Sequence, residues 1–405
     1  MLKFLAASAL AIGFGASTCR AQEGAFDLYV AAARAIMPAK PPVDGVNDSK
    51  NRPPREQAQL YTSARRTAFL RTNRRAFDLF ERAQKTPLRP RTGRSVTSEF
   101  PNYGKLREFA RVKSIEAKEW KWRGKWEKAL DSGLDTLQMG RAIEDPRNDS
   151  PILNSLVGIA VQAIGANFVR DVPPHLSATE ATRGAARLEA ILDDTPRYSQ
   201  VLQRDLWLTR TEMLQHITPK NSKSPATTQP EPRLGKPKKP LTREEVLQEV
   251  ESINAAIEPI IAQADWPVGA ILLPPDFTKI ETYEETDSVA VYYPQMARRG
   301  IWNYARRKAT NQNLLLRLAL RAYRLENGTY PTKLAQLAPK YLKKVPIDPF
   351  GRGETWLYKR SGDAYLAWSV GPDGKDDGGI SIAPRKNNGR VIIMEDSKGD
   401  WIARP

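Results

Sequence analysis

The longest uninterrupted helical pattern in the chain, from about residue 296 to residue 326, constrains the fold more than any other feature. Apolar side chains recur there at three- and four-residue spacing: Ile301, Trp302, Ala305, Ala309, Leu315, Leu316, Ala319, Leu320 and Tyr323. Gly328 follows where a helix would end. Two runs of alternating apolar residues, 355–359 and 364–370, are typical of short strands. The C-terminal region, 296–405, is therefore predicted to contain one long helix and a small antiparallel sheet.

The preceding region, 25–218, has a mostly helical pattern with few β-branched runs. Ser177 and Glu180 have the spacing of a helix-capping box. Two proline-bearing segments, 38–54 and 87–101, are expected to separate helical hairpins. The predicted fold class is α+β, with a mostly helical hairpin or bundle region followed by the long helix and the small antiparallel sheet.

One stretch of this helical region resembles a tetratricopeptide hairpin. Small and aromatic residues stand at the positions that such a hairpin uses: Ala117, Trp120, Gly124, Trp126 and Ala129. The glycine is expected in the turn, and Trp120, Trp122 and Trp126 are expected to pack in the core or between the helices. No second copy recurs at that period, so an irregular helical bundle with aromatic core residues is the alternative.

Two segments connect the helical region to the C-terminal region. Residues 219–240 are rich in Pro, Lys, Ser and Thr and carry almost no large apolar side chains, so they are predicted to form a disordered linker. Segment 241–295 should begin with a helix capped by Thr242 and Glu245. Its remainder, 266–293, indicates a connecting loop with room for one short strand.

The first 21 residues have the three-part layout of a secretory signal peptide: Lys3, an apolar run over 4–16, and small residues up to Ala21. The run is shorter than the roughly 20 residues of a transmembrane helix. We therefore expect export to the periplasm or the extracellular space. Cys19, the only cysteine, is removed with the signal, which leaves no thiol, or carries a lipid if a lipoprotein peptidase cuts before it.

The next most apolar stretch is 153–169. Gln162 and Asn167 interrupt it, so it predicts a buried helix, and no membrane span is expected after signal cleavage.

The formal net charge of +17 is concentrated in segment 51–128, which contains 21 Lys and Arg against 8 Asp and Glu. For an exported chain, such a segment favours a protein partner or an anionic envelope component, such as lipid headgroups or an acidic polymer. Nucleic acid is not expected outside the cytoplasm. The alternative is that these charges only keep a helical surface soluble.

Several separate motifs follow the long helix in order: Gly328-Thr329-Tyr330-Pro331, Val345-Pro346-Ile347-Asp348-Pro349-Phe350-Gly351 and Ser369-Val370-Gly371-Pro372-Asp373-Gly374. This order resembles the globular domain of the major pseudopilin of type II secretion systems, over about residues 310–380. The resemblance implies a helix packed on a small antiparallel sheet. The family's leader and its apolar, filament-forming helix have no counterpart in this sequence, so the domain is expected to serve as a module and not as a filament subunit.

The resemblance also implies a calcium site in the last of these motifs. Asp373 matches the family's aspartate and Val370 matches the position of a carbonyl ligand. Because Ca²⁺ takes six to eight oxygen ligands, Asp376 and Asp377 would have to supply others. The alternative is that the two Asp-Gly pairs of this loop are plain turns, which glycine favours because it tolerates positive φ.

The sequence shows no motif of a known catalytic machinery. Its two histidines, His175 and His216, lack the spacing of a metal site or a triad and are expected at the surface or at helix caps. A carboxylate pair is the remaining catalytic option, and the candidates are Asp193, Asp194, Glu281, Glu284 and Glu285. We predict an exported, non-catalytic binding or assembly protein with a pseudopilin-like module. A component of a type II secretion or pilus-like machine and a secreted carboxylate-based hydrolase are the alternatives.

Overall fold

The fold is α+β, as the sequence predicts, in a computed structural model that describes residues 24–37, 62–89, 96–148, 151–215, 242–272, 289–383, 385–387 and 390–405. The predicted signal peptide (1–21) with Cys19, the predicted linker (219–240) and His216 lie outside the described residues.

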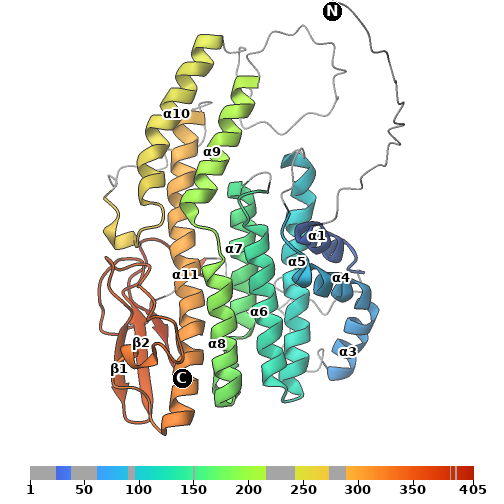
Figure 1. Cartoon of the computed structure of the whole chain (residues 1–405), viewed down its shortest axis with the longest axis vertical. Coiled ribbons are helices and arrows are strands. Elements are labelled where there is room, and N and C mark those ends of the chain that lie inside the picture. Colours follow the sequence, from blue (N-terminus) through green and yellow to red (C-terminus); the bar gives the residue numbers. More distant parts are fainter. Residues whose placement is uncertain are drawn as a thin grey trace, which may run out of the picture.

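In the described part of the chain before residue 296, all regular secondary structure is helical (Figure 1). Residues 296–405 are called the C-terminal module. In chain order the first helices are α1 (Ala25–Arg34), α3 (Ser63–Thr72), α4 (Arg74–Lys85), α5 (Val96–Trp122), α6 (Trp126–Ile143), α7 (Pro151–Phe168), a 3₁₀ helix at Pro173–His175, α8 (Ala178–Asp193), α9 (Tyr198–Gln215), α10 (Arg243–Gln263) and a second 3₁₀ helix at Val268–Ala270. The capping boxes predicted at Ser177 and Thr242 are both confirmed, since each side chain accepts a hydrogen bond from the backbone N–H three residues on.

The long predicted helix is α11 (Val289–Asn327), and Gly328 ends it at a φ of 71°. It starts earlier than the sequence indicates, so the prediction of a loop over 289–293 is wrong. In the described residues 266–272, the 3₁₀ helix stands where the sequence left room for a short strand. Figure 1 shows α11 running along α9 and α10 in one half of its length and along α7 and α8 in the other.

The sheet beside the C-terminal half of α11 has three antiparallel strands in the order β1–β2–β5, with β1 at Leu357–Ser361, β2 at Ala364–Ser369 and β5 at Trp401–Ala403. A short 3₁₀ helix, Leu334–Leu337, precedes it. The apolar run from Val391 does not join this sheet. Part of it forms β4 (Arg390–Ile392), which pairs with β3 (Arg385–Asn387) in a separate ribbon.

Asp348 explains why two of the sequence motifs occur together. Its side chain is buried, and Oδ1 accepts hydrogen bonds from the Phe350 N–H (2.9 Å) and the Ser369 hydroxyl (2.6 Å). Oδ2 accepts one from the Val370 N–H (2.9 Å). The aspartate of the Asp-Pro-Phe-Gly turn thus ties that turn to the end of β2, where the Ser-Val-Gly-Pro-Asp-Gly loop begins.

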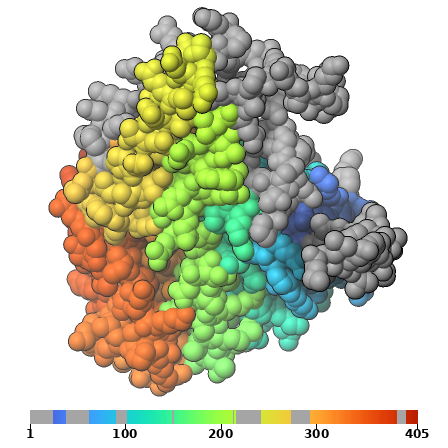
Figure 2. Space-filling view, turned by 45° about the horizontal axis from the view of Figure 1, so that its top comes forward, coloured from blue at the N-terminus to red at the C-terminus, as the bar shows by residue number. Residues whose placement is uncertain are grey.

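One hydrophobic core joins residues from both sides of the predicted boundary at residue 296. It contains Leu130 of α6, Leu188 of α8, Leu318 of α11, and Phe350 and Tyr365 of the module. In Figure 2 the module (orange) lies directly against α8 and α9 (green) and α10 (yellow). The face of α11 that points away from the sheet is therefore covered by helices of the same chain.

The hairpin predicted around Gly124 is formed by α5 and α6. Gly124 has a φ of 68° in the turn, while Trp120 and Trp126 pack against the core. The structure corrects two details. Helix α5 begins at Val96, inside the predicted proline-bearing break, and Trp122 is 68 % exposed instead of packed in the hairpin.

Helix α7 lies among α5, α6, α9 and α11. Within the described residues it is the one helix long and apolar enough to cross a membrane, and 56 % of that stretch is buried inside the protein. Four glycines allow close contact with α6: a Cβ on Gly140 would lie 2.7 Å from the carbonyl oxygen of Gly158, and one on Gly165 would lie 3.0 Å from that of Gly133. The helix backbones touch directly at these points.

A buried polar network crosses the same region. The carboxylate of Glu144, at the end of α6, forms an ion pair with Arg307 of α11, and neither side chain is more than 5 % exposed. Gln162 of α7 donates to Glu144 (2.6 Å) and accepts from Asn311 of α11 (2.8 Å). These contacts fix α6, α7 and α11 relative to one another.

Candidate functional site

The candidate site is a basic surface on α3, α4 and α5. Exposed basic side chains lie on these helices, just after α4, in the turn after α5 and at the start of α6. They are Arg65, Arg71, Arg74, Arg75, Arg82, Lys85, Arg89, Lys105, Arg107, Arg111, Lys118, Arg123, Lys125 and Lys128. Within the described residues 62–128, the exposed acidic side chains are Asp78, Glu81 and Glu108. We call this set of basic residues the basic surface. It lies on the side of the molecule away from the sheet (Figure 1).

The amphipathic pattern of α4 produces the densest part of this surface. Ala76, Phe80 and Ala83 are buried against α1 and α5, so the residues between them face outward. Arg74, Arg75 and Arg82 are among these outward-facing residues. None of these three arginines forms an ion pair with another described residue.

Other charges of segment 51–128 are used inside the protein. Glu119 is buried and accepts hydrogen bonds from Arg66 (2.8 Å), Arg123 (2.6 Å) and the Ser63 hydroxyl (2.6 Å). These hydrogen bonds outweigh the effect of burial and lower the pKa of Glu119. Lys113 is also buried, and it pairs with Glu116 and lies over the Phe80 ring. Some charges of the segment therefore hold its helices together, and Arg123 both does this and belongs to the basic surface.

Trp122 stands at one end of the basic surface. It is 68 % exposed, and Arg123 and Lys125 beside it are exposed as well. An indole with an apolar body and one N–H donor, placed among cations, suits the headgroup level of a membrane. The sequence indicates a core position for Trp122, and only its place beside the turn glycine distinguishes it from Trp120.

The residues predicted to bind calcium lie together in the loop after β2. Asp376 Oδ1 accepts hydrogen bonds from Trp368 Nε1 (2.8 Å) and the Gly378 N–H (2.9 Å), and Asp373 accepts one from the Lys375 N–H (3.3 Å). Asp377 Oδ2 is buried and has no hydrogen-bond partner. Among the described residues, no three His, Cys, Asp or Glu side chains are grouped so that they could hold a metal in this conformation.

Asp400 closes the same loop from the C-terminal end. Its carboxylate accepts from the Gly379 N–H (2.7 Å) and the Asp377 N–H (3.3 Å). Burial raises the pKa of Asp400, and the charges of Asp376 and Asp377 raise it further. Asp376 and Asp377 are therefore close enough to repel the Asp400 carboxylate, and a bound cation would relieve this repulsion.

Of the catalytic candidates, the two that the structure describes each have a basic partner. Asp193 forms an ion pair with Lys343 and Asp194 with Arg141, and both acids are exposed. Glu281, Glu284 and Glu285 lie outside the described residues. His175 is exposed, and its ring stacks on Trp126 with a centroid separation of 3.6 Å.

Comparison of the chain with protein-family models, with curated proteins and with solved structures finds no match. The pseudopilin-like and tetratricopeptide-like resemblances stay predictions.

Proposed function

We propose that the chain is an exported, non-catalytic binding or assembly protein that binds an anionic envelope component through the basic surface. The observation that carries the proposal is the imbalance of exposed charge on α3–α5, where Asp78, Glu81 and Glu108 are the described acidic side chains that face solvent. Such a surface attracts phosphate- or carboxylate-bearing partners and loses affinity as salt screens it. Trp122 favours an anionic lipid surface over a soluble polymer.

The proposal predicts that reversing three charges abolishes most of this binding. The variant Arg74→Glu/Arg75→Glu/Arg82→Glu should bind phosphatidylglycerol vesicles at least about tenfold more weakly than the unaltered chain, since each basic residue near an anionic membrane contributes about 1 kcal/mol. Co-sedimentation at low salt measures the loss. Binding to vesicles of phosphatidylcholine alone should be weak for both proteins.

A matched control changes the same net charge elsewhere. Lys359, Lys375 and Lys398 are exposed on the C-terminal module, so replacing all three by Glu should leave the affinity for phosphatidylglycerol within about twofold. Equal losses in the two variants would show that net charge alone acts, and the basic surface would lose its role. Trp122→Ala should weaken vesicle binding and leave binding to polyglutamate unchanged.

A second candidate function is calcium binding by the loop that contains Val370, Asp373, Asp376 and Asp377. The unpartnered Oδ2 of Asp377 and the repulsion among Asp376, Asp377 and Asp400 favour it. Binding would require the turn hydrogen bonds of Asp373 and Asp376 to give way to the ion. The proposed site would thus form by adjustment of the loop.

Thermal unfolding with and without calcium tests this second candidate. If the dissociation constant is about 10⁻⁴ M, as in extracellular calcium modules, 1 mM Ca²⁺ should stabilise the fold by about 1.4 kcal/mol and raise the Tm by about 2 °C. EDTA should reverse the shift, and Asp377→Asn should remove it. An unchanged Tm would identify the loop as a plain turn.

Assembly into a secretion or pilus-like machine is the third proposal, and the packing of α11 restricts it. A filament stem must offer a free helix face to its neighbours, whereas α7, α8 and α10 cover the face of α11 that points away from the sheet. Docking through this module would therefore use the side that carries the sheet, where the last three residues of β1, 359–361, are exposed.

A further inference from the structure

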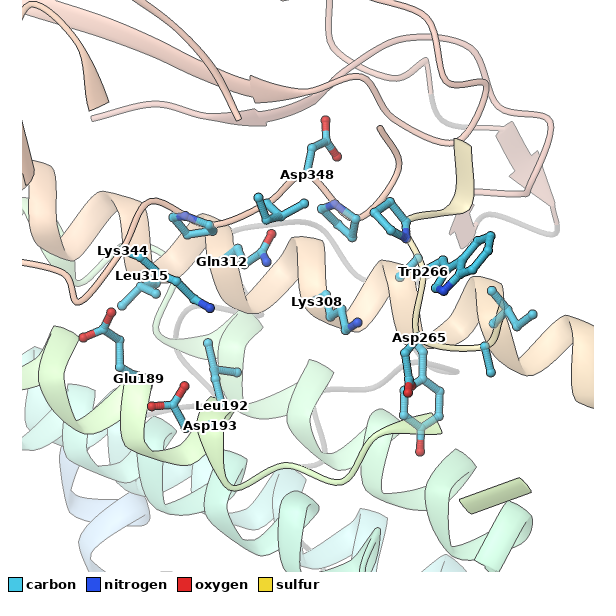
Figure 3. A pocket seen from close by; sticks show the side chains of 18 residues that line it. Glu189, Leu192, Asp193, Asp265, Trp266, Lys308, Gln312, Leu315, Lys344 and Asp348 are labelled. Carbon is cyan, nitrogen blue, oxygen red and sulfur yellow. The ribbon is translucent and has the colours of Figure 1, made fainter. Parts of the chain in front are cut away.

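A pocket of about 410 Å³ lies where α11, the end of α8 and the loop at 344–349 meet (Figure 3). This volume is within the range of about 300–1,000 Å³ that small-molecule sites occupy. Leu192, Ile301, Leu315, Pro346 and Pro349 supply apolar wall. The residues that line the pocket belong neither to the basic surface nor to the proposed calcium loop, 370–377.

The carboxylates that line this pocket already have partners. Glu189 accepts a hydrogen bond from the Lys343 N–H (2.9 Å), and Asp193 forms an ion pair with the Lys343 ammonium. Asp265 accepts from both the N–H and the hydroxyl of Ser199. The fourth carboxylate, Asp348, accepts the three hydrogen bonds described above. Each carboxylate of the pocket is therefore held by a contact within the protein.

Three side chains that line the pocket keep donors without a partner in the described chain. Within the described residues, the ammonium groups of Lys308 and Lys344 form neither an ion pair nor a hydrogen bond. Gln312 Oε1 accepts a hydrogen bond from Trp356 Nε1 (2.8 Å), which orients the amide so that its NH₂ group keeps both donors. Lys308 and Gln312 are one turn apart on α11 and both face the pocket (Figure 3). A ligand that completes these groups must bring acceptors.

The surroundings of Lys308 also favour a ligand that brings negative charge. Its side chain is exposed toward the pocket, yet the surrounding protein and the charges of Arg307 and Arg197 lower the pKa of its ammonium group. Asp265 acts in the opposite direction and compensates this only in part. Loss of solvent around Lys308 thus disfavours its ammonium form, and an anion bound beside it in the pocket would stabilise that form.

We propose that this pocket binds a small organic anion, with its charged group on Lys308, Lys344 and the Gln312 amide and its apolar part against Leu192, Ile301 and Leu315. A charge-assisted hydrogen bond to an ammonium group in a partly enclosed site is stronger than a neutral one, so the anionic group fixes the ligand's orientation. The apolar wall adds affinity in proportion to the ligand surface that it buries.

The test uses two fluorescent probes of the same shape, 8-anilinonaphthalene-1-sulfonate and the uncharged N-phenyl-1-naphthylamine, with the full chain. Lys308→Met should raise the dissociation constant of the sulfonate about tenfold and leave that of the neutral probe within about twofold. Lys308→Arg should keep the sulfonate affinity within about threefold. Lys375→Met, an exposed lysine of the same module, should change neither.

A second variant tests the place of binding. Leu192→Trp should fill the pocket and weaken the binding of both probes at least about tenfold, while circular dichroism shows an unchanged helix content. The proposal is overturned if the unaltered chain does not bind the sulfonate or if Lys308→Met leaves its affinity unchanged. It is equally overturned if Lys308→Met weakens both probes alike, or if Leu192→Trp weakens neither.

Discussion

Replacing Arg307 by Met is expected to lower the free energy of unfolding by about 3–5 kcal/mol, because the substitution leaves a buried carboxylate without its counter-ion. Glu144 is fully buried, and Arg307 is its ion-pair partner. Gln162 and Tyr304 can still donate to Glu144, but neutral donors do not replace a cation. Urea denaturation of the two proteins measures the difference.

Two further variants separate the ion pair from other effects of the substitution. Arg306→Met changes the neighbouring exposed residue of the same helix and should cost less than about 0.5 kcal/mol. The double variant Glu144→Gln/Arg307→Met should recover much of the loss, since no charge is then left buried. A double variant as unstable as Arg307→Met would show that packing around Arg307, and not the charge of Glu144, is decisive.

The same network makes the loss dependent on pH. Burial raises the pKa of Glu144 from 4.5 to about 7, although Arg307 and the hydrogen bonds oppose the shift. A carboxyl group with a raised folded-state pKa binds its proton more tightly in the folded state, so its contribution to stability falls as the pH rises through this interval. Without Arg307 the folded pKa rises further. Arg307→Met should therefore lose less stability at pH 5 than at pH 8, and equal losses would contradict the assignment.

The sequence predicts those helices and turns of the chain that neighbouring residues specify. The spacing of apolar residues identifies α11, the side chains of Ser177 and Thr242 identify two helix starts, and Gly124 identifies a turn. Each of these signals depends on residues within one or two turns of each other. For that reason a single sequence is sufficient to find them.

The surroundings of α11 are not predicted, because they depend on residues far away in the chain. Arg306, Arg307 and Lys308 are three consecutive basic residues of α11. In the structure Arg306 lies over the Trp302 ring, Arg307 pairs with a glutamate 163 residues earlier, and Lys308 lines a pocket. No spacing rule connects Glu144 to Arg307, so neither the ion pair nor the pocket has a sequence signal.

Strand order is a second feature that local propensity does not decide. The apolar run from Val391 has the stronger strand composition, yet Trp401–Ala403 joins the main sheet. Asp400, just before β5, is held by the N–H groups of Gly379 and Asp377. These contacts place the following residues beside β2. Propensity selects segments that are able to form strands, while the loop contacts select which of them pairs.

The second large effect is expected at the contact between α6 and α7. Gly158→Val should lower the free energy of unfolding by about 3 kcal/mol, at the upper end of the usual cost of overpacking. A Cβ at this position would lie 2.5 Å from the carbonyl oxygen of Gly140 and 2.4 Å from the Glu144 side chain. The backbone of α6 cannot rotate away, so the helices must separate and the bond between Gln162 and Glu144 must lengthen.

Gly104 supplies the control, because it is also a helical glycine but has open space where a Cβ would stand. Gly104→Ala should raise the free energy of unfolding by about 0.5–1 kcal/mol, since alanine loses less backbone entropy in a helix than glycine does. Helix propensity favours both alanine and valine over glycine, so a loss of stability in Gly158→Val would come from the close approach of α6. If Gly158→Val were as stable as the unaltered chain, the two helix backbones would not be in contact, and the geometry that brings Glu144 to Arg307 would need another cause.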